Sequence, residues 1–324
     1  MKLTPTLRNL FAFVLITTLL LSGCARSTPT PAEMPTLRIA VLPIIDTLPM
    51  YVAQQEGLFT KYNVKVEFVP VGSAPERDQV LAAGQADGTV NELLSVFFFN
   101  KDSVQMQVVS YALVPTATSP HFFILASAQG GITRPEELKN VPIGVSQGTI
   151  IEYVNEGILT GQGLQPTEIQ TVAVPKISDR MALLSSGELK AAVMPDPLAA
   201  LAVQQGAVIV ADDAAYPQYG FSVISFRKAV IDQNPTAIAG FLAALKEAKL
   251  LLSQKPDSYK NLLSEQKLVP EPLIASYTIP YFSTSGVPSE AEWNLASDWA
   301  IAKGLINTRP AYAEAINGGY LPVP

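Results

Sequence analysis

The residues of this chain that could do chemistry suit the binding of a small molecule more than its conversion. They are polar or aromatic side chains that follow predicted strands or open predicted helices: Asp46, Thr47, Tyr51, Asn91, Glu92, His121, Gln147, Thr149, Tyr153 and Asp196. The single histidine, His121, and the single cysteine, Cys24, exclude a multi-histidine metal site, a thiolate-rich metal site and an internal disulfide. No GxxxxGK phosphate loop occurs, and no GxGxxG motif follows a predicted strand. The sequence therefore predicts a binding protein without a cofactor or a metal.

The charges at these positions favour a neutral ligand. A nitrate or sulfonate group in a dry site needs a matching cation, and the basic residues of the predicted loops are Arg77, Lys176 and Arg180. We interpret these three as solvated surface charges. The remaining side chains are rich in acceptors, which suits a ligand with many N–H and O–H donors, and the aromatic ones could stack on a ring. We expect Asp46→Ala to weaken ligand binding with little loss of fold stability.

The elements that position these side chains alternate between strand and helix. Apolar and alternating runs predict strands at residues 37–42, 64–69, 87–90, 106–111, 121–126, 142–145, 169–174, 191–194, 208–210 and 221–226. Helices are predicted at residues 48–56, 75–83, 91–99, 150–160, 177–186, 197–205, 256–265 and 288–303, with a long one from 235 onward. This order indicates parallel sheets with helices on their faces. Asp46 or Thr47 is expected to cap the first helix, which ends at a left-handed Gly57.

Two such α/β blocks are joined by crossing segments near residues 115–126 and 214–224. We expect residues 37–120 and 221–324 to form lobe I, and residues 121–220 to form lobe II. Ligands of open α/β sheets bind beyond the carboxyl ends of the strands, so two facing sets of loops predict a hinged cleft. His121 lies in a crossing segment, where it contacts the ligand, makes the hinge sensitive to pH, or serves only as a structural histidine.

The N-terminus indicates export and a lipid anchor. Two basic residues precede an apolar run at residues 10–21, which is shorter than the roughly 20 residues of a membrane-spanning helix. The sequence Leu-Ser-Gly-Cys at 21–24 resembles the lipobox of bacterial lipoproteins. Residues 1–23 are therefore predicted to be a signal peptide, and Cys24 to carry the lipid, of the palmitate type. Residues 24–36 form a Pro- and Thr-rich tether that holds the protein at the extracytoplasmic face of the cell membrane.

Several segments, in order, resemble the periplasmic-binding-protein family of taurine, aliphatic sulfonate, nitrate and thiamine-precursor importers, the SsuA/THI5-like group. They are residues 49–59, 83–88, 138–149 and 184–197, and the helix that follows Pro235. The resemblance implies an α/β, two-lobed periplasmic-binding-protein fold of type II, with two doubly wound sheets, a two-segment hinge and a helical C-terminal part. It also implies a solute-binding subunit, not an enzyme, that delivers its ligand to the permease and ATPase of an ABC importer.

The ligand is the open point, because Lys190 and Asp196 depart from the family pattern. We expect a vitamin-type aromatic heterocycle, riboflavin first and a thiamine-precursor pyrimidine second. The alternative is a sulfonate, taurine or nitrate anion. Two other classes are an enzyme that resembles thiamine-pyrimidine synthases, which depend on cysteines, histidines and iron, and a lipoprotein sensor domain. A formal charge of −6 with scattered basic residues argues against a nucleic-acid partner, and we expect a monomer.

Overall fold

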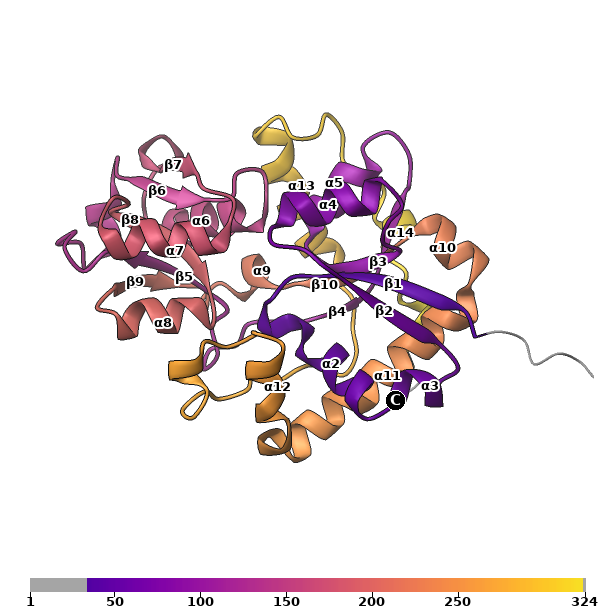
Figure 1. Ribbon diagram of the computed structural model, residues 1–324. Coiled ribbons are helices and arrows are strands. Elements are labelled where there is room, and N and C mark those ends of the chain that lie inside the picture. Colours follow the sequence, from indigo (N-terminus) through magenta and orange to yellow (C-terminus); the bar gives the residue numbers. More distant parts are fainter. Residues whose placement is uncertain (1–33, 323–324) are drawn as a thin grey trace, which may run out of the picture. The chain divides into compact units, whose positions relative to one another are not determined.

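The computed structural model describes residues 34–322, so the predicted signal peptide and Cys24 lie outside the described residues. The first of two sheets has the strand order β2-β1-β3-β10-β4 (Figure 1). Its strands are β1 (Thr36–Val41), β2 (Lys65–Pro70), β3 (Gly88–Asn91), β4 (Met106–Tyr111) and β10 (Val223–Arg227). Strand β1 pairs in parallel with β2 and β3, whereas β10 is antiparallel to both of its neighbours.

The second sheet repeats this plan with the order β7-β6-β8-β5-β9. Its strands are β5 (Phe122–Ala126), β6 (Pro142–Val145), β7 (Gln170–Ala173), β8 (Ala191–Pro195) and β9 (Val208–Asp212). Strand β6 pairs in parallel with β7 and β8, and β5 is antiparallel to β8 and β9. The chain passes from the first sheet to the second between β4 and β5, and returns between β9 and β10.

The expectation of purely parallel sheets is wrong for β5 and β10. A parallel neighbour needs a long crossover connection, usually a helix. These two strands instead follow directly on a segment that arrives from the other sheet, and each enters its sheet between two existing strands in the opposite direction. Both sheets are therefore mixed, and the two crossing segments lie next to these inserted strands.

Helices cover both faces of the first sheet. They are α2 (Leu48–Gln55), α3 (Leu58–Lys61), α4 (Ala74–Ala82), α5 (Leu93–Asn100), α10 (Lys228–Gln233), α11 (Pro235–Gln254), α12 (Lys260–Glu265), α13 (Glu290–Ala302) and α14 (Tyr312–Ala315). Residues of α2 and α11 share one apolar core with the sheet, and residues of α5 and α13 share the other. The long helix predicted from residue 235 onward is confirmed as α11, and Ile238, Phe241, Leu242 and Leu245 on one of its faces are buried.

Helices also lie on both faces of the second sheet. They are α6 (Ile150–Gly161), α7 (Ile177–Ser186), α8 (Leu198–Gln204) and the short α9 (Pro217–Gly220). Helix α6 packs into the core of one face, and α7 and α8 into that of the other. Single 3-10 turns occur at η1 (Ile45–Thr47), η2 (Pro135–Leu138), η3 (Pro166–Glu168), η4 (Pro256–Tyr259), η5 (Glu271–Leu273) and η6 (Gly318–Tyr320).

Helix α2, which follows β1, ends as predicted but does not begin as predicted. Gly57 has φ +66°, so the left-handed end predicted for α2 is confirmed. The predicted cap at the start of α2 is wrong, because neither Asp46 nor Thr47 makes a side-chain cap bond there. Both belong to η1, where Thr47 already has near-helical dihedral angles instead of the extended backbone of a capping residue. The Thr47 hydroxyl donates instead to the carbonyl oxygen of Ile44 at 2.7 Å.

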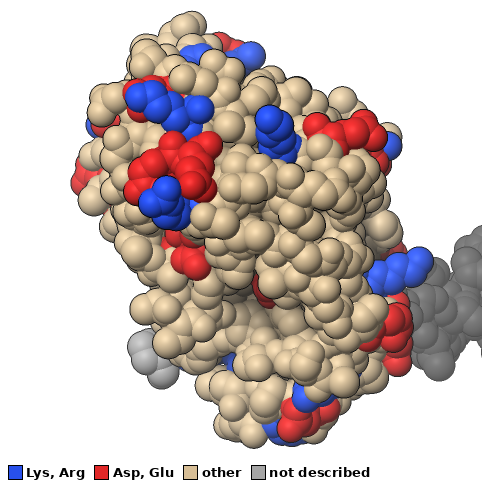
Figure 2. Space-filling view, turned by 90° about the vertical axis from the view of Figure 1, so that its left-hand side faces the viewer, with Lys and Arg blue, Asp and Glu red and all other residues tan. Residues whose placement is uncertain are grey.

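Charges of both signs are mixed on the face of the molecule that Figure 2 presents. Lysine and arginine side chains are interspersed there with aspartate and glutamate, and uncharged residues surround a hollow below the centre. A patch of one sign, which a nucleic-acid partner would need, is not seen on that face. Among the described helices, none combines the length and the apolar character that crossing a membrane requires.

Candidate functional site

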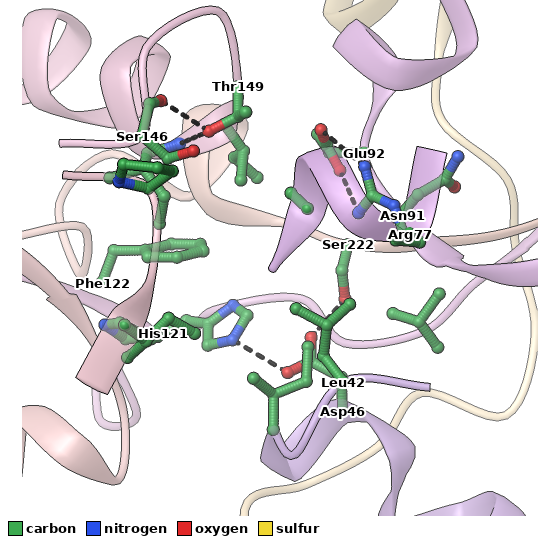
Figure 3. Close-up of a pocket in the computed structure, with 18 of the residues that line it drawn as sticks. Leu42, Asp46, Arg77, Asn91, Glu92, His121, Phe122, Ser146, Thr149 and Ser222 are labelled. Carbon is green, nitrogen blue, oxygen red and sulfur yellow. Dashed lines mark hydrogen bonds and ion pairs between the residues drawn. The ribbon is translucent and has the colours of Figure 1, made fainter. Parts of the chain in front are cut away.

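A cavity of about 70 Å³ is lined by residues of both sheets and of both crossing segments. The first sheet contributes the loop after β1, the start of α4 and the junction of β3 with α5. The second contributes the start of β5, the end of β8 and the loops that lead from β6 into α6 and from β7 into α7. The lining residues are Leu42, Ile44, Asp46, Ala74, Arg77, Val90, Asn91, Glu92, His121, Phe122, Ser146, Thr149, Ile150, Ile151, Pro175, Ile177, Arg180, Pro195 and Ser222. Figure 3 shows Ser146 and Thr149 across the space from Glu92 and Arg77, with His121 and Asp46 at one end.

Arg180 is the cation of this cavity that has no carboxylate partner within the described part of the chain. It is fully buried in the first turns of α7. Its Nε donates to the carbonyl oxygen of Val193 at 3.1 Å, and its Nη1 donates to those of Val174 and Pro175 at 2.8 and 3.1 Å. Its Nη2 has no hydrogen-bond partner among residues 34–322. Burial lowers the pKa of Arg180 to about 10, so the guanidinium is still charged at neutral pH.

The N-terminus of α6 supplies further donors on the same side. Thr149 caps the helix, with its hydroxyl accepting from the amide of Ile151 at 3.3 Å and donating to the carbonyl of Ser146 at 2.7 Å. The hydroxyl of Ser146 itself is buried and has no partner in the described part of the chain. The positive end of a helix dipole favours an anion at this position. Ser146 Oγ and Arg180 Nη2 are thus two unused polar groups in the lining of one cavity.

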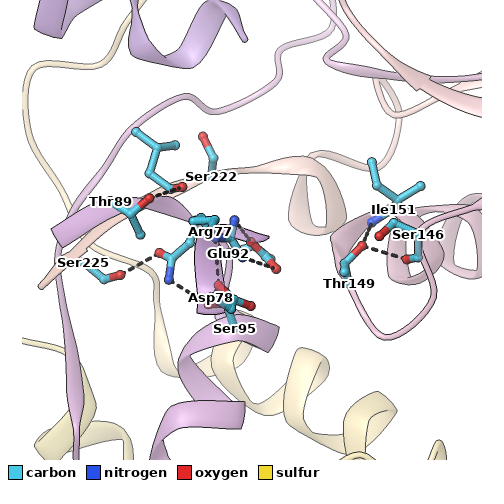
Figure 4. A network of polar contacts seen from close by, with 12 residues as sticks. Arg77, Asp78, Thr89, Glu92, Ser95, Ser146, Thr149, Ile151, Ser222 and Ser225 are labelled. Atoms are coloured by element: carbon cyan, nitrogen blue, oxygen red, sulfur yellow. Dashed lines mark hydrogen bonds and ion pairs between the residues drawn. The ribbon is translucent and has the colours of Figure 1, made fainter. Parts of the chain in front are cut away.

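Arg77 is also buried, but it is saturated by acids. Its Nη1 and Nη2 donate to the two carboxylate oxygens of Glu92 at 2.9 and 3.2 Å, and its Nε donates to Asp78 at 2.8 Å. Asp78 in turn accepts from the hydroxyl of Ser95 at 2.9 Å (Figure 4). Burial would lower the pKa of Arg77, but the two carboxylates outweigh it and raise the pKa above its usual value. The network presents no free charge to a ligand.

A second ion pair joins the two crossing segments to the loop after β1. His121 Nε2 lies 3.1 Å from Asp46 Oδ1, and Ser222 donates to Asp46 Oδ2 at 2.5 Å. The other ring nitrogen of His121 lies 3.0 Å from the carbonyl oxygen of Gly220. Both partners of the imidazole are acceptors, so both nitrogens donate and the ring is a cation. Burial opposes this charge, but the attraction and hydrogen bond of Asp46 raise the pKa of His121 to about 9.

The pKa of the Asp46 carboxyl is shifted in the opposite direction, downward. Burial would raise its pKa, but the imidazolium of His121 and the hydroxyl of Ser222 favour the charged form and hold the pKa below its usual value. The first and second sheets are therefore joined at the cavity by a buried ion pair, since Asp46 follows β1 and His121 precedes β5. His121 therefore both lines the cavity and pairs with Asp46.

Half of the ten predicted binding residues line the cavity. They are Asp46, Asn91, Glu92, His121 and Thr149. Thr47 and Tyr51 do not: Thr47 is buried with its hydroxyl turned to its own backbone. The ring of Tyr51 packs edge-on against Phe68 with centroids 4.9 Å apart, because that face of α2 is directed to β2.

The other predicted residues also lie outside the cavity. Gln147 is exposed, and its amide donates to Thr171 at 3.3 Å. Tyr153 is buried among other aromatic rings. Asp196 accepts a hydrogen bond from Tyr277 and lines a separate, open groove.

The interpretation of Arg77 and Arg180 as solvated surface charges is wrong, because both are buried. The sequence does contain a signal for this. Arg180 lies three residues after Ile177 and four before Leu184, on the face of α7 that turns to the sheet, and Arg77 lies four residues before the buried Leu81 on α4. A basic residue at an apolar position of a helix requires buried acceptors or a ligand.

A contact between α6 and α13 connects the two halves on another side. Lys303, which follows α13, forms ion pairs with Glu156 and with Glu152, the latter at 3.4 Å. Trp299 donates from its indole N–H to Glu156 at 2.8 Å, and its ring lies 5.3 Å from that of Tyr153. The N-terminus of α6 lies at the cavity and supplies hydrogen-bond donors there. This contact with α13 therefore fixes the N-terminus of α6 relative to the first sheet. Among the described residues, no cluster of three or more potential metal ligands occurs.

Comparison with known proteins identifies the family. The model of the NMT1-like family matches residues 30–264. The chain belongs to the NMT1-like family. A relative in Escherichia coli (strain K12), named as an aliphatic sulfonates-binding protein, is 25% identical to this member over 230 residues, which is 70% of each chain.

Two solved structures resemble this NMT1-like protein in fold. The alkanesulfonate-binding protein SsuA from Xanthomonas axonopodis pv. citri, bound to MOPS, has a TM-score of 0.75 at 18% identity. The match covers 88% of this chain and 99% of the SsuA chain. The periplasmic aliphatic sulphonate binding protein SsuA from Escherichia coli has a TM-score of 0.73 at 22% identity. The match covers 87% of this chain and 97% of that SsuA chain. These likenesses confirm the predicted α/β periplasmic-binding-protein fold.

Proposed function

We propose that this NMT1-like protein is the solute-binding subunit of an ABC importer and that its solute is a small oxyanion, a sulfonate first and nitrate second. The observation that carries the proposal is the pair of unused donors in one cavity, Arg180 Nη2 and Ser146 Oγ. A buried guanidinium without a carboxylate is costly unless a ligand completes its hydrogen bonds. The sulfonate-binding relatives support the same ligand class.

The remaining lining fits the body of such a ligand. Besides the two donors, the cavity is bordered mainly by aliphatic side chains and Phe122. Its other polar members are already hydrogen-bonded within the protein: Asn91, for example, donates to Ser95 at 3.1 Å and accepts from Ser225 at 2.7 Å. One anionic end and a compact uncharged body therefore match the site better than a molecule with many donors.

Riboflavin, the ligand first expected, fits this cavity less well. The expectation depended on free carboxylates, and both carboxylates of the lining are neutralised by Arg77 and His121. Pockets for drug-sized ligands measure about 300 to 1,000 Å³, and the cavity of about 70 Å³ is far smaller. Two of the aromatic residues expected to stack on a ring, Tyr51 and Tyr153, do not line it.

A thermal-shift screen tests the proposal. Purified protein is heated with 1-propanesulfonate, nitrate, riboflavin or an aminopyrimidine, each over a wide concentration range. At 100 times its Kd, a ligand adds about 2.7 kcal/mol to the free energy of unfolding. We expect this stabilisation from the sulfonate or nitrate. A shift with riboflavin or the pyrimidine, and none with either anion, would contradict the proposal. Consumption of the ligand during incubation, followed by NMR, would indicate the alternative enzyme class.

We further propose that the protein acts at the membrane surface through a lipid on Cys24. A tether of residues 24–36 raises the local concentration of the binding protein at its permease. Cys24→Ser should move the protein from the membrane fraction to the soluble fraction, and the mass of the lipid should disappear from the N-terminal peptide. Equal membrane association of the variant and the unaltered chain would contradict the anchor.

A further inference from the structure

We infer that the cavity discriminates against ligands that carry an ammonium group, so that it accepts oxyanions with an uncharged body and rejects zwitterions of the taurine type. This inference rests on the proposed function, because it assumes that an oxyanion occupies the cavity. It concerns a different set of residues, namely those that would have to receive the positive end of the ligand.

The first step concerns the carboxylates, which are the natural partners of an ammonium. Two of them line the cavity, Asp46 and Glu92. The oxygens of Asp46 are engaged by His121 at 3.1 Å and by Ser222 at 2.5 Å. Those of Glu92 are engaged by Arg77 at 2.9 and 3.2 Å. Each of the four oxygens therefore already accepts a hydrogen bond, and each acid is balanced by a cation from within the protein.

The neutral acceptors of the lining are occupied as well. The amide oxygen of Asn91 accepts from Ser225, and the backbone oxygen of Ser146 accepts from Thr149. The carbonyl of Pro175 accepts from Arg180. The buried polar side-chain atoms left without a partner in the lining, within residues 34–322, are Arg180 Nη2 and Ser146 Oγ. One is a cationic donor and the other is a hydroxyl that can satisfy only one hydrogen of an ammonium.

The second step concerns the electrostatic balance. Two of the three cations in the lining are paired with acids, Arg77 with Glu92 and with Asp78 behind the lining, and His121 with Asp46. Arg180 has no acidic partner among residues 34–322, and its charge is matched by the negative end of the ligand. An additional ammonium in the same small cavity would lie near Arg180 in a mostly aliphatic lining, and it would lose its hydration without gaining a partner. The zwitterion is rejected because its complex with the protein would contain a buried ammonium without a partner.

Arg77 is therefore the specificity-determining residue, because it withholds Glu92 from the ligand. In Arg77→Met the carboxylate of Glu92 becomes available to an ammonium, while Asp78 keeps its bond from Ser95. The matched variant Glu92→Gln acts in the opposite sense, since it replaces the carboxylate with a neutral amide and leaves the guanidinium of Arg77 less neutralised. The first variant should relax the discrimination, and the second should keep or increase it.

The experiment compares 1-propanesulfonate with taurine, which has nearly the same shape but carries an ammonium in place of the terminal methyl group. Isothermal titration calorimetry gives the ratio of the two Kd values. For the unaltered protein we expect 1-propanesulfonate to bind at least about 100-fold more tightly. For Arg77→Met we expect the ratio to fall below about tenfold, and for Glu92→Gln to stay at 100-fold or above.

The outcomes separate this inference from the proposed function. If taurine binds the unaltered protein within about tenfold of 1-propanesulfonate, the inference is overturned and the binding of an oxyanion stands. If neither compound binds, and nitrate also fails, the proposed function is wrong and the inference falls with it. If Arg77→Met does not fold, as thermal unfolding would reveal, the ratio for the unaltered protein and for Glu92→Gln decides the matter.

Discussion

Arg180→Met is expected to reduce the affinity for the oxyanion by roughly 100-fold or more, which corresponds to about 3 kcal/mol. Arg180 lines the cavity, and among the described residues its Nη2 has no hydrogen-bond partner and its hydrogen bonds go to carbonyl oxygens and not to a carboxylate. Removing the guanidinium leaves the anion with the hydroxyl of Ser146 and the dipole of α6. Titration calorimetry with 1-propanesulfonate measures the loss.

Arg227→Met is the matched control for this change. Arg227, like Arg180, donates to a backbone carbonyl, that of Ala86, but unlike Arg180 it pairs with an acid, Asp87, and it does not line the cavity. The Arg227→Met variant should lose some stability and keep its affinity for 1-propanesulfonate. Arg180→Lys should lie between the two, because an ammonium keeps the charge but not the fork geometry of the guanidinium. An affinity for Arg180→Met within threefold of the unaltered protein would remove Arg180 from the binding site.

Asp46→Ala is expected to lower the free energy of unfolding by about 3 to 5 kcal/mol, the cost of breaking a buried ion pair on one side. This reverses the expectation drawn from sequence, that the change leaves stability almost untouched. The carboxylate of Asp46 is buried and bonded to both His121 and Ser222, so its removal leaves a buried imidazolium without its counter-charge. Denaturant unfolding at pH 6 measures the effect. Asp46→Asn, which keeps an acceptor of the same size, should cost less.

The penalty of Asp46→Ala should also depend on pH. The pKa of His121 is raised from about 6.5 to about 9 in the folded protein, so its contribution is fully present below pH 6.5 and is lost as the pH rises through 9. This shift corresponds to about 3 kcal/mol. At the acid end, the lowered pKa of Asp46 means that the contribution is lost as the pH falls below about 4.

The comparison of variant and unaltered protein isolates this pair from other titrating groups. Burial lowers the pKa of Lys249 to about 8, which increases stability as the pH rises from 8 to 10.5 and opposes the effect of His121. Both proteins share Lys249, so the difference between them cancels its contribution. We expect the penalty to be largest near pH 6 and to shrink by pH 10. A penalty that is independent of pH would show that His121 is not a cation in the folded protein.

Local sequence patterns were sufficient for most of the elements. The strand at residues 106–111 and the helix at 177–186 have the bounds that periodicity predicts, and Gly57 ends α2 as its turn chemistry requires. These features depend on neighbours within a few residues, which a sequence shows directly. Strand direction was not predictable in the same way, because β5 and β10 pair with strands that are distant in the chain.

The sequence by itself determined that the chain is an α/β protein, and its single histidine and single cysteine exclude a multi-histidine and a thiolate-rich metal site. It predicted ten binding residues, and the fold decided that five of them line one cavity. Only the tertiary structure decided the charge of that cavity. Asp46 meets His121 from 75 positions away and Ser222 from 176 positions away, so the sequence counts an acid where the fold places a neutralised pair. The same packing buries Arg180 without an acidic partner among residues 34–322, so a cavity predicted to be acidic contains an unpaired cation beside neutralised acids.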